Sequence, residues 1–208
     1  MAISIRTGTD TDPSLTAVDH DEVRLLAERY GQPHCRTYDI VADAHLRQQR
    51  WRAAPDRRGE VVFAIRQPNG KILLHTKPQY EERFYRLPSG GIRPFEPVED
   101  ALLREVEEET GQIVSVRRFV GLFNCRFHRR GDTAMFASYI FYLESHTAEL
   151  NATDTDEIAG YQFVAPEHLG HVALALRSLR GPRRRWGYWR SLAHDLVYRF
   201  LTCAEIGD

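Results

Sequence analysis

Apolar residues first recur with a helical period near the start of the chain. The apolar stripe consists of Val23, Leu26, Ala27 and Tyr30. Asp19 or Asp21 can cap the N-terminus of such a helix, and Gly31 can end it, so the pattern predicts a helix over residues 19–30. A second, less clearly amphipathic helix is expected over residues 40–53, before Pro55. The first dozen residues, rich in Thr, Asp and Ser, are expected to be loose.

The pattern changes to short β-rich runs after Glu60. The runs VVFAIR and KILLHTK are joined through Pro68-Asn69-Gly70, which predicts a β-hairpin. A helix is expected over residues 98–110, ending at Gly111, and further strands over 113–129, 134–144 and 158–164. Strands on both sides of a central helix, with more helices at the ends, predict an α/β or α+β sandwich rather than a regular βαβ winding.

The C-terminal part combines a basic segment with an amphipathic helix. The apolar stripe of the helix is Trp189, Leu192, Ala193, Leu196, Val197, Phe200 and Leu201. It can pack on the core or form a dimer contact. The basic segment contains Arg177, Arg180, Arg183, Arg184, Arg185 and Arg190. Aromatic residues are interleaved with these arginines, so the segment can either bind RNA or be an ordinary solvated surface.

Overall composition narrows the class of protein without naming a partner. Lys and Arg total 28 against 29 Asp and Glu, so the net charge of −1 gives no general attraction to nucleic acid or acidic membranes. Three distant cysteines suit neither a disulfide framework nor a paired zinc site, and we expect three buried thiols in a reducing compartment. No apolar run resembles an export signal or a bilayer-spanning segment. We therefore expect a cytoplasmic protein that does not bind membranes.

The residues that carry chemistry lie in the segment 87–111, LPSGGIRPFEPVEDALLREVEEETG. Glu105, Glu108 and Glu109 stand three and four positions apart, so a helix places their carboxylates on one face. Like charges this close repel one another unless a cation offsets them. A hard divalent cation that prefers oxygen ligands does this well, which makes Mg²⁺ or Mn²⁺ the expected cofactor.

The same segment resembles the signature of the Nudix hydrolase family. That signature reads Gly, five residues, Glu, seven residues, Arg-Glu-apolar-any-Glu-Glu-any-Gly-apolar. The positions that match in register are Gly90, Glu96, Arg104, Glu105, Val106, Glu108, Glu109 and Gly111. Two positions depart from the pattern: Gln112 replaces the closing apolar residue, and Phe95 stands where relatives often have glycine. Neither position supplies oxygen ligands to a metal.

The resemblance implies a fold and a set of residue roles. The implied fold is a Nudix-like α/β/α sandwich with a mixed sheet, spanning residues 58–170. Residues 1–57 then form an N-terminal helical extension, and residues 171–208 form the basic segment and C-terminal helix. Glu105, Glu108 and Glu109 would be catalytic metal ligands. The residues that would shape or brace the site are Gly90, Gly91, Glu96, Arg104 and Gly111.

Residues outside the motif are assigned from their chemistry and position. Arg83 and Arg86 lie just upstream of the motif and Arg126 on a following strand, so these three are candidates for binding substrate phosphates. A general base needs a carboxylate on a loop near the metal ligands. Related enzymes often place such an acid on the loop that here contains Asp154, Asp156 and Glu157, and Glu157 is our first choice, followed by Asp156.

Three functions remain open at this point. The first is hydrolysis of the pyrophosphate bond of a small nucleoside diphosphate derivative, of the ADP-ribose, nucleotide-sugar or dinucleotide type. The second is hydrolysis at an RNA end that uses the basic segment, and the third is ligand sensing without turnover. The intact glutamates favour an enzyme. The region beyond the motif, RFHRRG, does not identify the substrate, and the oligomeric state is also open because many relatives are dimers.

Overall fold

The fold is known from a computed structural model that describes residues 5–6, 18–50, 57–80, 84–153 and 156–203. Its described elements are β1 (Ile5–Arg6), α1 (His20–Tyr30), β2 (His34–Val41), α2 (Ala44–Arg50), β3 (Gly59–Arg66), β4 (Ile72–Thr76), β5 (Ser89–Ile92), α3 (Val98–Thr110), β6 (Val114–Arg129), β7 (Asp132–Ser145), β8 (Gly160–Val164), α4 (Leu169–Ser178) and α5 (Arg184–Thr202). Short 3-10 turns precede α4 and α5.

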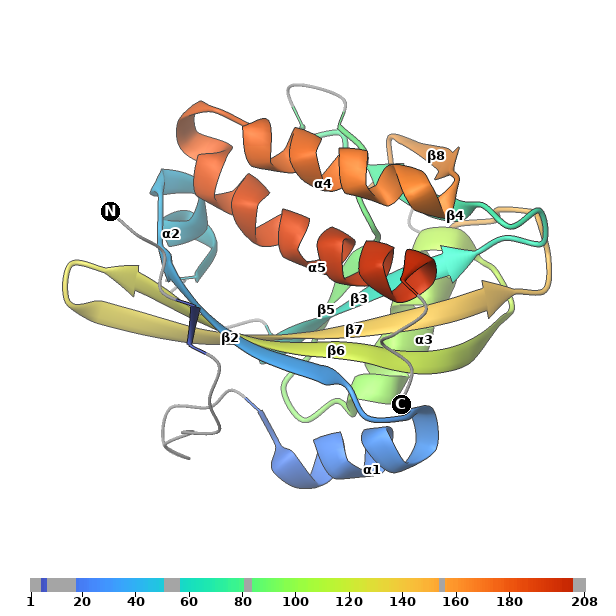
Figure 1. Ribbon diagram of the computed structural model, residues 1–208, viewed down its shortest axis with the longest axis horizontal. Helices are drawn as coiled ribbons and strands as arrows, with labels where there is room; N and C mark the ends of the chain where they lie inside the picture. Colours follow the sequence, from blue (N-terminus) through green and yellow to red (C-terminus); the bar gives the residue numbers. More distant parts are fainter. Residues whose placement is uncertain (1–4, 7–17, 51–56, 81–83, 154–155, 204–208) are drawn as a thin grey trace.

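One mixed sheet forms the centre of the molecule (Figure 1). Its described strands follow the order β1-β2-β6-β7-β3-β4-β8, and β5 pairs with β3 beside this path. The pairs β2 with β6 and β3 with β7 are parallel, and the other pairs are antiparallel. The mixed sheet that the sequence predicts is therefore confirmed.

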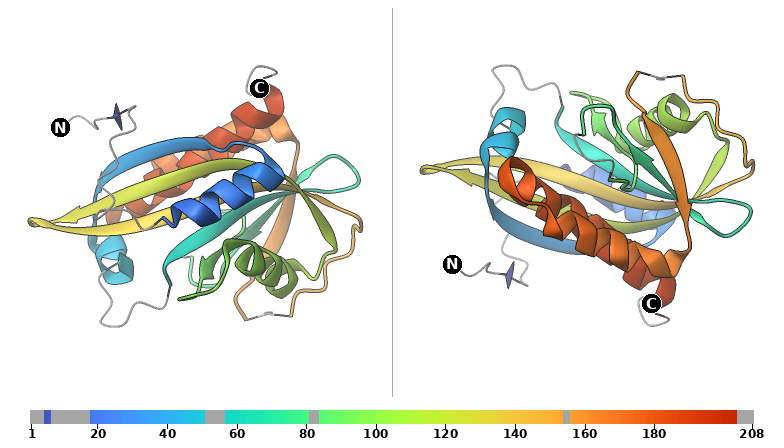
Figure 2. Two further views of the ribbon diagram at one scale, coloured as in Figure 1. Left: turned by 90° about the horizontal axis from the view of Figure 1, so that it is seen from below. Right: turned by 90° about the horizontal axis from the view of Figure 1, so that it is seen from above.

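Helices cover both faces of the sheet (Figure 2). On one face, α2, α4 and α5 enclose a core that includes Leu46, Leu169 and Trp186. On the other face, α1 and α3 enclose a second core that includes Leu26, Leu102 and Phe141. Two cores separated by a sheet define an α/β/α sandwich, and the predicted fold class is confirmed.

The stripe predicted on the C-terminal helix is buried in the first of these cores. Trp189, Leu196 and Val197 of α5 are 3%, 1% and 0% exposed. Aromatic contacts strengthen the packing, since the Trp189 ring meets the Phe127 and Phe136 rings edge-on at 5.3 and 5.7 Å between centroids. This helix is therefore an integral layer of the sandwich.

Several local predictions are confirmed by specific contacts. Asp19 caps α1 by accepting hydrogen bonds from the backbone N–H groups of Asp21 and Glu22 at 3.0 and 3.1 Å. α3 ends at Gly111, whose φ of 62° lies in the left-handed region. β3 and β4 form the predicted antiparallel hairpin around Gly70.

The helix expected over residues 40–53 is wrong in its first part. Ile40 and Val41 belong to β2, which pairs in parallel with eight residues of β6, and α2 begins only at Ala44. Asp43 caps it through Leu46 N–H at 2.9 Å. The long-range ladder with β6 overrides the local helical tendency. Residues 51–53 lie outside the described part.

Three smaller expectations also need correction. The last strand begins at Gly160 rather than Ile158, because its ladder with β4 starts at that residue. A further helix, α4, occupies the start of the segment expected to be basic and solvated, and it buries Leu169, Ala173 and Leu176 against α5. Finally, only Cys125 is buried, whereas Cys35 and Cys203 are exposed.

Among the described residues, no helix has the length and apolar character needed to cross a bilayer.

Candidate functional site

The predicted metal-binding segment folds as strand, loop and helix. β5 pairs with β3, with Gly90 opposite Val61, and a short loop then leads into α3. Gly90 is required by a close approach, because a Cβ atom there would lie 1.7 Å from the Cδ atom of Glu105. The absence of a side chain thus lets the Glu105 carboxylate lie directly against the β5 backbone.

Arg104 holds this segment together. Its Nε and Nη2 atoms donate to the two oxygens of Glu96 at 2.7 and 2.9 Å, and Nη2 also donates to Gly91 O at 2.9 Å. Nη1 donates to Glu105 Oε1 at 2.8 Å and to Glu108 Oε2 at 2.9 Å. Arg104 therefore joins the loop to α3 through three carboxylates. The ion pair with Arg104 holds the pKa of Glu96 below its usual value.

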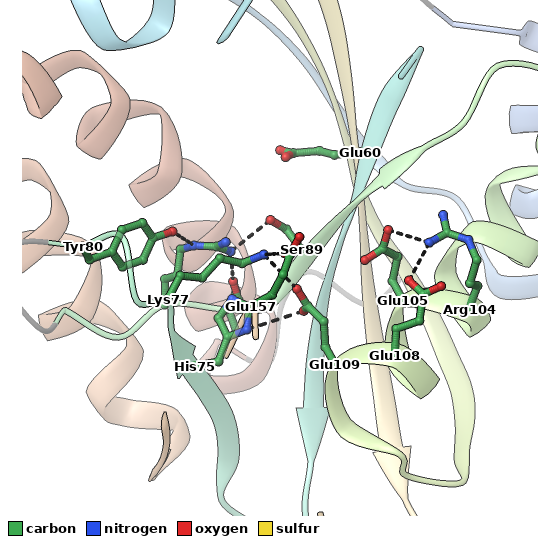
Figure 3. Close-up of polar contacts among 12 residues, drawn as sticks. Glu60, His75, Lys77, Tyr80, Ser89, Arg104, Glu105, Glu108, Glu109 and Glu157 are labelled. Carbon is green, nitrogen blue, oxygen red and sulfur yellow. Dashed lines mark hydrogen bonds and ion pairs between the residues drawn. The ribbon is translucent and has the colours of Figure 1, made fainter. Parts of the chain in front are cut away.

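Glu109 faces away from Arg104, toward β4 (Figure 3). Its Oε2 atom lies 3.5 Å from Nδ1 of His75, and its Oε1 atom lies 3.3 Å from Nζ of Lys77. The side chain is 4% exposed, and burial raises the pKa of Glu109 to about 7. Burial also lowers the pKa of His75 well below its usual value. Neither oxygen of Glu109 has a hydrogen-bond partner among the described residues.

These groups surround one cavity of about 350 Å³. The residues that line it are Arg57, Lys77, Ser89, Gly90, Gly91, Arg93, Arg104, Glu105, Glu108, Glu109 and Glu157. Four carboxylates and four cations thus face a common space that is almost free of apolar groups. Such a lining suits a compact, multiply charged ligand.

Glu157 reaches this cavity from a turn that precedes β8. Its carboxylate forms a short hydrogen bond with the ammonium group of Lys77, which lowers the pKa of Glu157. The side chain is 57% exposed. The structure therefore brings Glu157 to the three glutamates of α3. Asp156 is exposed and does not line the cavity, and Asp154 lies outside the described residues.

The three arginines proposed to bind phosphate have different locations. Arg86 is 3% exposed and donates to Tyr80 Oη at 2.8 Å and to Ser89 Oγ at 2.9 Å, so it supports the strand that enters the site. Arg126 donates to Asp39 Oδ2 at 2.6 Å across β2 and β6. Neither lines the cavity. Arg83 lies outside the described residues.

Sequence reasoning missed four residues of the site. His75 lies on β4 and Lys77 just beyond it, whereas Arg57 precedes β3 and Arg93 follows β5. The alternation of side chains along KILLHTK places His75 and Lys77 on the same side of the strand, which is the one signal that could have found them. Arg57 and Arg93 carry no comparable pattern.

The site is suited to a divalent metal ion by the chemistry of its donors. Glu105, Glu108 and Glu109 offer only oxygen ligands, and the two oxygens of Glu109 are buried without hydrogen bonds. Glu105 and Glu108 contact Arg104, whereas Glu109 contacts Lys77. Among the described residues, no three metal-ligating side chains converge on one point.

The basic segment is largely engaged with the fold itself. Arg190 donates to both oxygens of Glu60 at 2.9 and 2.7 Å, and Arg177 forms an ion pair with Asp195. Arg183 donates to Gln79 O at 2.8 Å. Arg180 and Arg184 are exposed. Several of the positive charges in this segment therefore serve to hold α5 in place.

Comparison with known proteins identifies the family. A family model described as "NUDIX domain" matches residues 55–187, and the chain therefore belongs to the Nudix family. Over 62 residues it is 40% identical to "Putative 8-oxo-dGTP diphosphatase YtkD" of Bacillus subtilis, a match that covers 30% of this chain and 37% of the relative. Over 90 residues it is 31% identical to "ADP-ribose pyrophosphatase" of Methanocaldococcus jannaschii, covering 43% of this chain and 52% of the relative.

The matches thus span about a third and a half of the length of these two curated relatives. Among solved structures, an ADP-ribose pyrophosphatase from Streptococcus suis is 20% identical, with a TM-score of 0.45 over 70% of this chain and 92% of that one.

Proposed function

We propose that this protein is a divalent-metal-dependent Nudix hydrolase that cleaves the pyrophosphate bond of a nucleoside diphosphate linked to another moiety. The observation that carries this proposal is the shared cavity, in which Glu105, Glu108, Glu109 and Glu157 face four cations beside the β5 backbone. The names of the two curated relatives, a diphosphatase and a pyrophosphatase, support the same class of reaction.

The glutamates of the cavity and the Arg104–Glu96 pair have separate roles in this proposal. Glu105, Glu108 and Glu109 would hold the metal, while Arg104 and Glu96 fix the loop between β5 and α3. When a divalent cation is bound there, its charge offsets the negative charge that develops on the phosphate oxygens. Glu157 would accept a proton from the attacking water as that water forms a bond to phosphorus and the bridging oxygen leaves with the other phosphate.

The structure weakens support for the RNA alternative. Three of the arginines that would bind an RNA backbone already have partners within the fold. Arg177 pairs with Asp195 on α5, Arg183 donates to Gln79 O, and Arg190 donates to Glu60. The sensor alternative lacks a distinguishing observation, since the glutamates expected of an enzyme are all present. ADP-ribose, nucleotide sugars and dinucleotides therefore remain the preferred substrate types.

The test is a panel of these substrates, with 8-oxo-dGTP and capped RNA included, assayed for phosphate products with Mg²⁺, Mn²⁺ or a chelator. We expect turnover that stops on chelation. We also expect Glu108→Gln to reduce turnover at least about a hundredfold. Glu107→Gln is the matched control, because Glu107 lies on the same helix but is exposed and outside the cavity. Turnover that survives exhaustive chelation, or equal rates in both variants, would contradict the proposal.

A further inference from the structure

Lysine is rare in this chain, and its placement is unusual. Of the 28 lysine and arginine residues, two are lysines, Lys71 and Lys77. Lys71 is exposed in the turn between β3 and β4, whereas the side chain of Lys77 is 11% exposed at the wall of the cavity. A largely buried lysine side chain, in a chain whose other cations are arginines except for Lys71, indicates that this position favours a compact ammonium group.

The surroundings of Lys77 explain why arginine does not serve there. Its Nζ atom lies 3.3 Å from Glu109 Oε1 and contacts Glu157 Oε2 still more closely (Figure 3). A single small cation thus bridges a glutamate from α3 and a glutamate from the turn before β8. The planar guanidinium group of arginine is larger and would need more space between them.

Lys77 also differs from Arg104, which likewise bridges carboxylates in the cavity. All five N–H groups of Arg104 have partners in Glu96, Glu105, Glu108 and Gly91. An ammonium group has three N–H donors, and within the described residues Lys77 makes one hydrogen bond, to Glu157. The Lys77 ammonium group therefore has donors to offer an anion, whereas all the donors of Arg104 are already in use.

We propose that Lys77 is a substrate-binding residue whose ammonium group donates to a non-bridging oxygen of the diphosphate and thereby leaves Glu157 free to face water. This inference rests on the proposed function for the identity of the site, and it adds a residue that the motif does not contain. Lys77 thus exchanges one anionic partner for another when the diphosphate enters the cavity.

The first experiment measures binding of methylenediphosphonate, a diphosphate analogue that cannot be hydrolysed and has no base. Calorimetry in metal-free buffer is run on the full chain, Lys77→Met and Lys71→Met. We expect Lys77→Met to weaken binding at least about tenfold, since it removes a charged hydrogen-bond donor. Lys71→Met should bind within about twofold of the parent. Equal affinity in the parent and in Lys77→Met would overturn the proposal.

A double variant separates phosphate binding from mere positioning of Glu157. If Lys77 acted only by holding Glu157, then Lys77→Met would have no effect on affinity in a Glu157→Gln background. We expect the tenfold loss to persist in that background. Its disappearance would assign Lys77 a positioning role and overturn direct binding.

A measurement on the unaltered sequence covers the case in which Lys77→Met fails to fold. Biosynthetic labelling with ¹³Cε-lysine gives two side-chain signals, and Lys71→Met assigns them. Titration with methylenediphosphonate should shift the Lys77 signal saturably and leave the Lys71 signal in place. Saturable binding with no shift at Lys77 would overturn the proposal.

These outcomes are independent of the proposed hydrolysis. A chain that hydrolyses a substrate of the panel but binds methylenediphosphonate equally well as Lys77→Met refutes the role of Lys77 alone. A chain that binds the analogue through Lys77 but hydrolyses none of the panel refutes the proposed function and leaves a diphosphate-binding site.

Discussion

The hydrogen bonds of His194 link α5 to the segment that leads into β5. His194 is 1% exposed on α5, and its Nε2 atom accepts a hydrogen bond from Leu87 N–H at 2.8 Å. Its Nδ1 atom lies 2.8 Å from Arg190 O and must donate there. The ring is therefore neutral, because protonation at Nε2 would set two donors against each other. Burial lowers the pKa of His194 from 6.5 to about 3.

This arrangement makes the stability of the fold depend on pH. The folded state binds a proton on His194 more weakly than the unfolded state does. The contribution of His194 to the free energy of unfolding is therefore fully present above pH 6.5 and is lost as the pH falls toward 3. Between pH 7 and pH 5 the loss from this one group is about 2 kcal/mol. His194→Phe removes this contribution and leaves Leu87 N–H unsatisfied, at a cost of about 1–3 kcal/mol at pH 7.

The assay is guanidinium unfolding at pH 7, 6 and 5 in metal-free buffer, followed by fluorescence of the buried Trp186 and Trp189. We expect His194→Phe to be less stable than the parent at pH 7 and nearly equal to it at pH 5. The control is His171→Gln, an exposed histidine on α4, which should stay within about 0.5 kcal/mol of the parent. A parent and a His194→Phe variant that lose the same stability between pH 7 and pH 5 would refute the reasoning.

Three further predictions concern the cavity and the basic segment. Glu157→Gln should lower kcat far more than it raises KM. An unchanged rate would show that Glu157 is not the general base. A loss of rate in Asp156→Asn instead would move that role one residue upstream. Gly90→Ala should reduce turnover at least about tenfold, because the new Cβ would displace the Glu105 carboxylate. Gly170→Ala is the control, because a Cβ atom there would lie 3.7 Å from the nearest side-chain atom. Replacing Arg183, Arg184 and Arg185 with Gln should leave small-molecule hydrolysis nearly unchanged, and a fall in RNA affinity measured at several salt concentrations would revive the RNA alternative.

The sequence predicts best those features that depend on residues close together in the chain. The span of α3 follows from local spacing and from Gly111, and the hairpin of β3 and β4 follows from its turn. The first part of the prediction over residues 40–53 failed because β2 is fixed by pairing with β6, 87 residues away in sequence. Local patterns contain no information about such a partner.

The same distinction applies to the site. The motif places three glutamates on one helix face, but it does not show that Glu109 turns toward His75 on β4 and Lys77 just beyond it. Arg86 lies close to the motif in sequence, yet its side chain is buried beneath the strand instead of lining the cavity. Proximity in sequence thus identified the segment that contributes three glutamates to the cavity but misjudged which cations surround it.

The bond between His194 and Leu87 also bears on how the protein is made. The two residues are 107 positions apart, and Arg190 meets Glu60 across 130 positions. At about 5–20 residues per second on the ribosome, Leu87 is synthesised roughly 5–20 seconds before His194. During that interval Glu60, 3% exposed in the finished fold, lacks the arginine that pairs with it. The nascent chain therefore forms these two long-range contacts only after α5 has emerged, so α5 packs onto a sheet that is synthesised before it.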